Sequence, residues 1–76
     1  DIREVSIDSK GEGLALSQVL KQAGLTASTS EAVRMIEQGG VKIDGEKVSD
    51  KALKLARGTR SVLQVGKRKF ARVTIA

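Results

Sequence analysis

The sequence predicts a small α+β domain in which two short helices pack against a small, mostly antiparallel sheet of four to five short strands. Two stretches have apolar residues at helical spacing, several short stretches alternate apolar and polar residues, and glycine-containing turns separate them. The 76 residues suffice for a single domain, 1–76, and a chain of this size buries only about 60% of its unfolded surface. We therefore expect one cooperative unit of modest stability.

The clearest helix signal begins at Ser28. Ser28 and Glu31 have the spacing of a capping box, in which the two side chains satisfy backbone N–H groups of the first turn. The apolar side of this helix consists of Ala32, Met35 and Ile36, and its free side of Ser30, Arg34 and Glu37. Gly39 and Gly40 supply the permissive backbone that ends a helix. This pattern predicts an amphipathic helix with one packed side.

The remaining elements follow from simpler patterns. Apolar residues at helical spacing from Leu16 to Ala23 predict a first helix that ends at Gly24 and packs on the second. The expected strands are residues 4–7, 41–43, 61–65 and 68–75. After residues 41–43 an Asp44-Gly45 turn is expected to return the chain as a hairpin strand that ends at residue 48. Residues 49–60 are ambiguous, since their apolar residues fit either one helical turn or a compact loop anchored by leucines, and we expect irregular chain there.

The last predicted strand has two unlike faces. Ala71, Val73 and Ile75 share one face, whereas Phe70, Arg72 and Thr74 share the other. This alternation predicts a sheet with a core side and a basic side.

Charge is distributed unevenly along the chain. Residues 1–50 hold six Lys or Arg and nine Asp or Glu, a net charge of −3. Residues 51–76 hold eight basic residues and no acidic one, a net charge of +8. A basic C-terminal third points to a polyanionic partner.

Several classes of function are excluded by composition. The chain has no Cys and no His, which excludes disulfides, thiol nucleophiles, imidazole bases and the usual zinc ligand sets. No run of apolar residues reaches the roughly 20 needed to span a bilayer. We predict no catalytic residue, no metal site and no membrane partner, and a cytoplasmic location.

Two motifs resemble known families. The run GLTASTSEAVRMIEQGGVKIDGEKV resembles the RNA-binding domain first named for small-subunit ribosomal protein S-four, and the likeness covers roughly Leu14 to Val48. The later run VGKRKFARV, with the earlier GGV, is similar to the C-terminus of bacterial tyrosyl-tRNA synthetases. The resemblance implies a small S-four-like domain of the alpha-L type that is a fragment of a longer enzyme.

The resemblance also implies a function. The chain would hold tyrosine tRNA, by its anticodon stem and long variable arm, for aminoacylation by a catalytic domain that the chain lacks. The implied parent is a homodimeric ATP-dependent ligase that uses ATP and Mg²⁺, whereas the fragment is a monomer without a cofactor. Its implied partners are tRNA and the parent's own catalytic domain. Two alternatives stay open: an S-four-like module of a pseudouridine synthase or ribosome-associated protein, and a protein-docking appendage without RNA affinity.

The predicted RNA-binding residues share a hydroxyl group or a positive charge. They are Ser28, Thr29, Ser30, Arg34, Lys42, Lys47, Lys67, Arg68, Lys69 and Arg72. Hydroxyls and free N–H groups at a helix N-terminus bind phosphate oxygens, and cations neutralise phosphates. Capping alone also explains Ser28, an ordinary exposed helix face explains Arg34, and a charged strand edge explains the last four residues.

Three positions depart from the family pattern. Many relatives carry Arg where this chain has Thr29 and Val33, and Asn where it has Asp44. Each departure lowers the local positive charge, so we expect weaker RNA contact through this helix. For Phe70, the only aromatic residue, stacking on a base and burial in the core both stay open.

Overall fold

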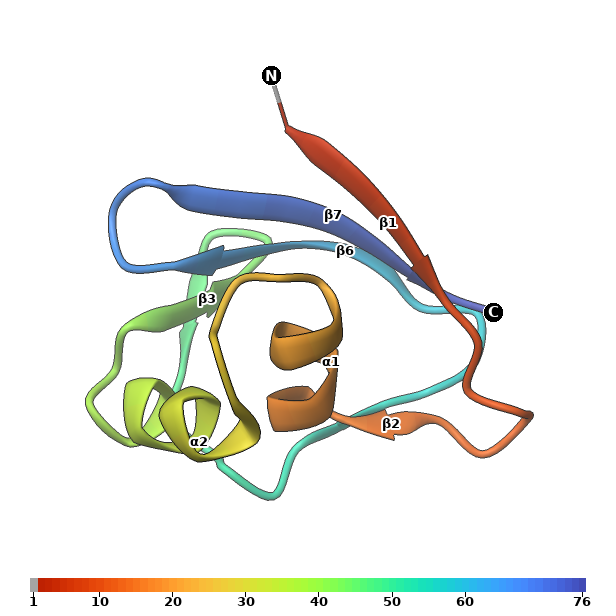
Figure 1. The fold of residues 1–76 in the computed structure, drawn as a ribbon, viewed down its shortest axis with the longest axis horizontal. Coiled ribbons are helices and arrows are strands. Elements are labelled where there is room, and N and C mark those ends of the chain that lie inside the picture. The colour runs from red at the N-terminus through yellow and green to blue at the C-terminus, as the bar shows by residue number, and fades with distance from the viewer. Residues whose placement is uncertain (1) are drawn as a thin grey trace.

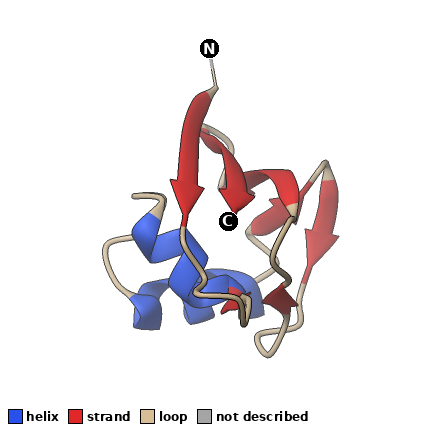
Figure 2. Cartoon of the chain, turned by 90° about the vertical axis from the view of Figure 1, so that its right-hand side faces the viewer, coloured by secondary structure: helices blue, strands red, loops and turns tan. Residues whose placement is uncertain are grey.

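The computed structural model describes residues 2–76, which form two helices and seven strands (Figure 1). The elements in chain order are β1 (Arg3–Ile7), β2 (Leu14–Ala15), α1 (Leu16–Gln22), α2 (Thr29–Glu37), β3 (Val41–Ile43), β4 (Glu46–Val48), β5 (Lys54–Leu55), β6 (Arg60–Val65) and β7 (Lys69–Ile75). Both helices lie on one side of the main sheet, as the perpendicular view in Figure 2 also shows. The other face of this sheet, which we call the outer face, carries no helix.

The main sheet has the strand order β1-β7-β6-β3-β4. β1 pairs with β7 in parallel, and the other neighbours pair antiparallel. The antiparallel pairs β3–β4 and β6–β7 are hairpins, whereas the parallel pair needs a long crossover, which the helices and the first hairpin supply. The predicted α+β fold with a mostly antiparallel sheet is confirmed.

The hydrophobic core lies between the helices and the inner face of the main sheet. Its buried residues are Ile7, Leu16, Val19, Leu20, Ala23, Leu25, Ala32, Ile36, Val41, Leu55, Leu63, Val65, Ala71, Val73 and Ile75. Met35 packs against this cluster but is only partly buried. Helices of seven and nine residues do not persist alone in water, so mutual packing and the sheet stabilise both.

Both helices end in the same hydrogen-bonded motif. At the end of α2, Gly39 has a φ of 74°, its N–H donates to the Ile36 carbonyl at 3.0 Å, and the Gly40 N–H donates to the Met35 carbonyl at 2.8 Å. This is a Schellman motif, and it needs a left-handed residue that glycine provides without strain. α1 ends in the same way at Gly24, so both predicted stops are confirmed.

The prediction of irregular chain over residues 49–60 is wrong in part. β5 lies within this stretch and pairs antiparallel with β2, so that Leu14 faces Leu55. The Leu16 N–H also donates to the Leu53 carbonyl at 2.9 Å. Two-residue strands show no alternation that a sequence pattern could reveal, and their pairing joins segments far apart in the chain. Smaller differences affect the last hairpin, where β6 begins at Arg60 and β7 at Lys69.

Candidate nucleic-acid interface

The N-terminus of α2 is capped as its sequence predicts. The Ser28 hydroxyl oxygen accepts a hydrogen bond from the Glu31 N–H at 3.1 Å. In return the Glu31 carboxylate accepts from the Ala27 N–H at 3.4 Å, one residue earlier than in a regular capping box. The helix start therefore carries its own carboxylate, which reduces its attraction for a phosphate.

An open groove lies between the first turns of α1 and α2. Its volume is about 480 Å³, and its lining consists of Ala15, Ser17, Gln18, Thr29, Ser30 and Val33. None of these side chains is charged, and Thr29 and Val33 are two of the positions that depart from the family pattern. The groove therefore offers hydroxyl and amide groups to a ligand, but no cation. Arg34 is exposed one turn beyond Ser30 on the same helix.

The outer face of the main sheet carries a second group of predicted residues. Lys42 on β3 pairs with Lys47 on β4 and with Gln64 on β6. Val41 and Ala71, the chain neighbours of Lys42 and Arg72, are buried against the helices, so Lys42 and Arg72 point to the opposite, outer side. Lys47 pairs with Lys42, but the end of its side chain lies against the backbone of Gly39 at the end of α2. The sheet thus separates Lys42 and Arg72 from Ser28, Thr29 and Ser30, which the sequence had grouped with them.

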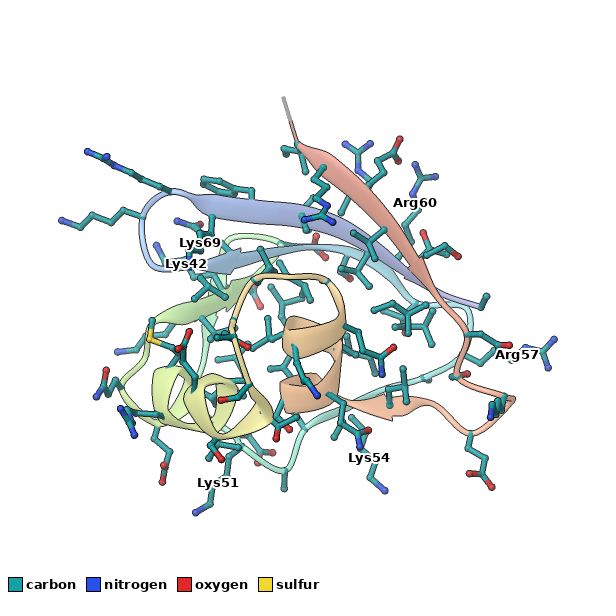
Figure 3. The ribbon with its side chains drawn as sticks, viewed as in Figure 1. Lys42, Lys51, Lys54, Arg57, Arg60 and Lys69 are labelled. Carbon is teal, nitrogen blue, oxygen red and sulfur yellow. The ribbon has the colours of Figure 1, made fainter. Side chains whose placement is uncertain are left out.

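The turn between β6 and β7 packs against the end of α2. Lys67, Arg68 and Lys69 are all exposed, and the Gly66 N–H donates to the Gly40 carbonyl at 2.8 Å, which attaches the turn to the end of α2. A second groove, of about 360 Å³, is lined by Glu31, Met35 and residues 65–69. Figure 3 shows Lys42 and Lys69 at this end of the sheet, well away from Lys54 and Arg57.

Few of these cations are neutralised within the protein. The ion pairs in residues 2–76 are Lys51–Glu37 at 3.4 Å, Arg60–Glu4 at 3.4 Å and Arg72–Glu4 at 3.5 Å. All five side chains are at least 40% exposed, so each pair is worth about 0–1 kcal/mol. Of the predicted cations only Arg72 is paired in the described chain, and it shares Glu4 with Arg60, which the sequence prediction missed.

Other kinds of site find little support in the described residues. Within residues 2–76 no three Asp or Glu side chains gather closely enough to hold a metal ion. In the same part of the chain, neither helix has the length and apolar character needed to cross a membrane.

Comparison with known proteins places this arrangement in a family. Residues 16–61 match the S4 domain, and the chain therefore belongs to the S4 domain family, as the motif from Gly24 to Val48 predicted. The relatives are more specific. The chain is 63% identical over 75 residues to the tyrosine-tRNA ligase of Nitrosospira multiformis, a match that covers 99% of the chain and 19% of that protein.

Two further ligases show the same pattern. The chain is 64% identical over 76 residues to the tyrosine-tRNA ligase of Cupriavidus pinatubonensis, covering 100% of the chain and 18% of the relative. It is 57% identical over 75 residues to the tyrosine-tRNA ligase of Shewanella oneidensis, covering 99% of the chain and 19% of the relative. The chain thus spans about a fifth of the length of these relatives and matches their C-terminal region. The predicted likeness to tyrosyl-tRNA synthetases is confirmed.

Proposed function

We propose that this chain is the tRNA-binding domain of a tyrosine-tRNA ligase and that it holds tyrosine tRNA by the anticodon stem and long variable arm. The observation that carries the proposal is a group of exposed cations at one end of the main sheet, none of them paired within residues 2–76: Lys42, Lys47, Lys67, Arg68 and Lys69. The relatives, all named tyrosine-tRNA ligases, support the choice of RNA.

The physical basis of binding is phosphate neutralisation combined with recognition of shape. A-form RNA has a deep, narrow major groove that side chains cannot read, so a basic surface senses the backbone and the 2′-hydroxyls. If about four cations contact phosphates, the logarithm of affinity falls with the logarithm of salt concentration at a slope near −3. The hydroxyls of Thr29 and Ser30 add hydrogen-bond donors without charge.

Aminoacylation belongs, in this proposal, to parts of a longer, homodimeric enzyme outside the chain. The described residues do not fit a site for ATP and Mg²⁺, because they contain no cluster of carboxylates and the chain has no phosphate-binding glycine motif. The chain's own role is to bind and orient the tRNA. Attachment to a catalytic domain that also holds tRNA raises the effective concentration, so modest affinity of the domain is sufficient.

A protein-docking appendage without RNA affinity is the main competing function. The basic C-terminal third would then contact an acidic protein surface, and the exposed apolar side chains of Ile2 and Phe70 favour this reading more than any other observation. A pseudouridine synthase or ribosome-associated parent is less favoured, because ligase relatives match nearly the whole chain, including its last hairpin.

An NMR titration tests the proposal. The isotopically labelled chain is titrated with tyrosine tRNA and with a tRNA that lacks the long variable arm, each at low and moderate salt. We expect salt-sensitive shifts on residues 28–42 and 67–72 that are larger with tyrosine tRNA. Equal shifts with both RNAs would contradict recognition of the variable arm, and no shifts with either would favour protein docking.

A further inference from the structure

A row of four side chains crosses the outer face of the main sheet. The register joins Phe70 on β7 to Gln64 on β6, Gln64 to Lys42 on β3, and Lys42 to Lys47 on β4. Neighbouring strands lie about 4.8 Å apart, so the backbones of Lys42 and Lys47 are about 10 Å and about 15 Å from that of Phe70. The row therefore places an aromatic ring at one end and two cations at the other.

Phe70 is exposed although it is the only aromatic residue of the chain. Its exposed fraction is 40%, whereas smaller apolar residues fill the core. Ile2, which is 42% exposed, lies beside it, because the parallel register pairs the next residues, Arg3 and Ala71. The alternative that Phe70 is a core residue is therefore wrong. Its exposure forgoes part of the stabilisation that full burial of such a side chain contributes.

Polar groups around the ring are fixed by the fold. The Gln64 side-chain N–H donates to the Gly66 carbonyl at 2.9 Å. This hydrogen bond fixes the side-chain amide of Gln64, the residue that pairs with Phe70 on the neighbouring strand. Arg72, two residues along β7 on the same face, contacts Glu4 at 3.5 Å and keeps 40% of its side chain exposed. Lys42 and Lys47 have no ion pair within the described chain. An exposed ring with cations on two sides has the composition of a nucleotide-stacking surface.

We propose that Phe70 is a stacking platform for an unpaired RNA nucleotide, with Lys42 contacting the phosphates on one side of it and Arg72 on the other. This inference rests on the proposed function and adds a second kind of contact to it. Bases inside a duplex are already stacked and cannot cover the ring, whereas a bulged, looped or terminal base can. The basic turn then contacts a stem, and the outer face takes an unpaired nucleotide next to it.

The first test compares two RNAs that differ only in an unpaired segment. The probes are a blunt RNA duplex and the same duplex with a bulge of several nucleotides, and the variants are Phe70→Leu and Phe70→Tyr. A stacked base contributes about 1–3 kcal/mol, so Phe70→Leu should weaken binding of the bulged duplex by about 5- to 150-fold. Binding of the blunt duplex should change less than about twofold, and Phe70→Tyr, which keeps the ring, should bind both RNAs normally. A loss that is equal for the two RNAs would overturn the proposal.

A fluorescence measurement reports stacking directly. The chain has no Trp and no Tyr, so Phe70→Trp introduces a single indole at the proposed platform. We expect its emission to be quenched by the bulged duplex and unchanged by the blunt one. Unchanged emission at saturating bulged RNA would overturn the proposal.

A pair of charge variants tests the cation end of the row. Lys42→Gln should weaken binding of the bulged duplex, whereas Arg57→Gln should not. Arg57 is exposed and has no ion pair in the described chain. It also lies at the other end of the sheet, where the Gly58 N–H donates to the Ile75 carbonyl at 2.7 Å (Figure 3). Equal effects of the two variants would contradict a contact at Lys42.

The outcomes separate this inference from the proposed function. If the unmodified chain binds neither duplex, the proposed function itself fails. If it binds both and Phe70→Leu has no effect on either, only the platform fails. Self-association of the chain that Phe70→Leu abolishes would mark Ile2 and Phe70 as a protein contact and overturn the platform.

Discussion

α2 and β7 bury their apolar sides in the same core, but their free sides differ. The free side of α2 carries Ser30, Arg34 and Glu37, which combine a hydroxyl with both signs of charge. β7 follows the basic turn and presents Phe70 and Arg72, and no acidic residue occurs after Asp50. The difference indicates that α2 chiefly organises the fold, whereas the β6–β7 hairpin supplies most of the charge for a partner. Four sets of variants test this division of roles.

The largest expected effect is on stability and comes from α2. Ile36 is fully buried, and Ile36→Ala should lower the free energy of unfolding by about 2–5 kcal/mol because it leaves a cavity in the core. Met35→Ala should cost less, since Met35 is only partly buried. Chemical denaturation of the two variants measures the difference. Equal costs would show that the two positions do not differ in burial in solution.

The second effect is on binding and comes from the turn. Replacement of Lys67, Arg68 and Lys69 by Ala should weaken binding of tyrosine tRNA at least about tenfold and flatten the salt slope from about −3 to about −1. The free energy of unfolding should hardly change, because all three side chains are exposed. The matched control replaces Lys51, Lys54 and Arg57, which removes the same charge elsewhere on the molecule (Figure 3). Equal losses in both triple variants would indicate an effect of net charge alone.

A smaller effect is expected at the helix cap. Ser28→Ala removes the acceptor for the Glu31 N–H and should cost about 1 kcal/mol of stability. Ser28→Asp keeps an acceptor and should restore most of it. Thermal unfolding measures both variants. If Ser28→Ala instead weakened RNA binding at unchanged stability, Ser28 would be a contact residue and not chiefly a cap.

The smallest effect is a gain of binding on the face of α2. Thr29→Arg with Val33→Arg places two cations at the edge of the groove between the helices. Each new phosphate contact should steepen the salt slope by about 0.7–0.9, and the two contacts together should strengthen binding about a few fold. The same substitutions made as Gln control for side-chain size. An unchanged slope would mean that RNA does not approach this groove, and that the outer face and turn bind alone.

Local signals explain why so much of the fold could be predicted. The cap at Ser28, the stop at Gly39 and the turn at Asp44 each depend on a few adjacent residues, and the structure confirms all three. Asp44 has a φ of 51°, and its carboxylate also accepts from the Val62 N–H at 2.9 Å. The β2–β5 pair could not be predicted, because it depends on contacts between distant segments and on strands too short to show a period.

The candidate site was less predictable than the fold. The sequence reveals which side chains are basic, and alternation predicted that Phe70 and Arg72 share a face. It predicts the β3–β4 hairpin but does not reveal that β3 pairs with β6, and only the order β7-β6-β3-β4 brings Lys42 and Lys47 into one row with Phe70. For the same reason the separation of Ser28 from Lys42 by the sheet could not be foreseen.

The hydrogen bond between Gly66 and the Gly40 carbonyl has a consequence for the energetics of recognition. It fixes the start of the β6–β7 turn to the Schellman motif of α2, which itself rests on the core. The backbone that carries Lys67, Arg68 and Lys69 is therefore ordered when the protein folds and not when RNA arrives. Only the side chains lose freedom on binding, so this preorganised support preserves affinity that a flexible basic loop would lose to entropy.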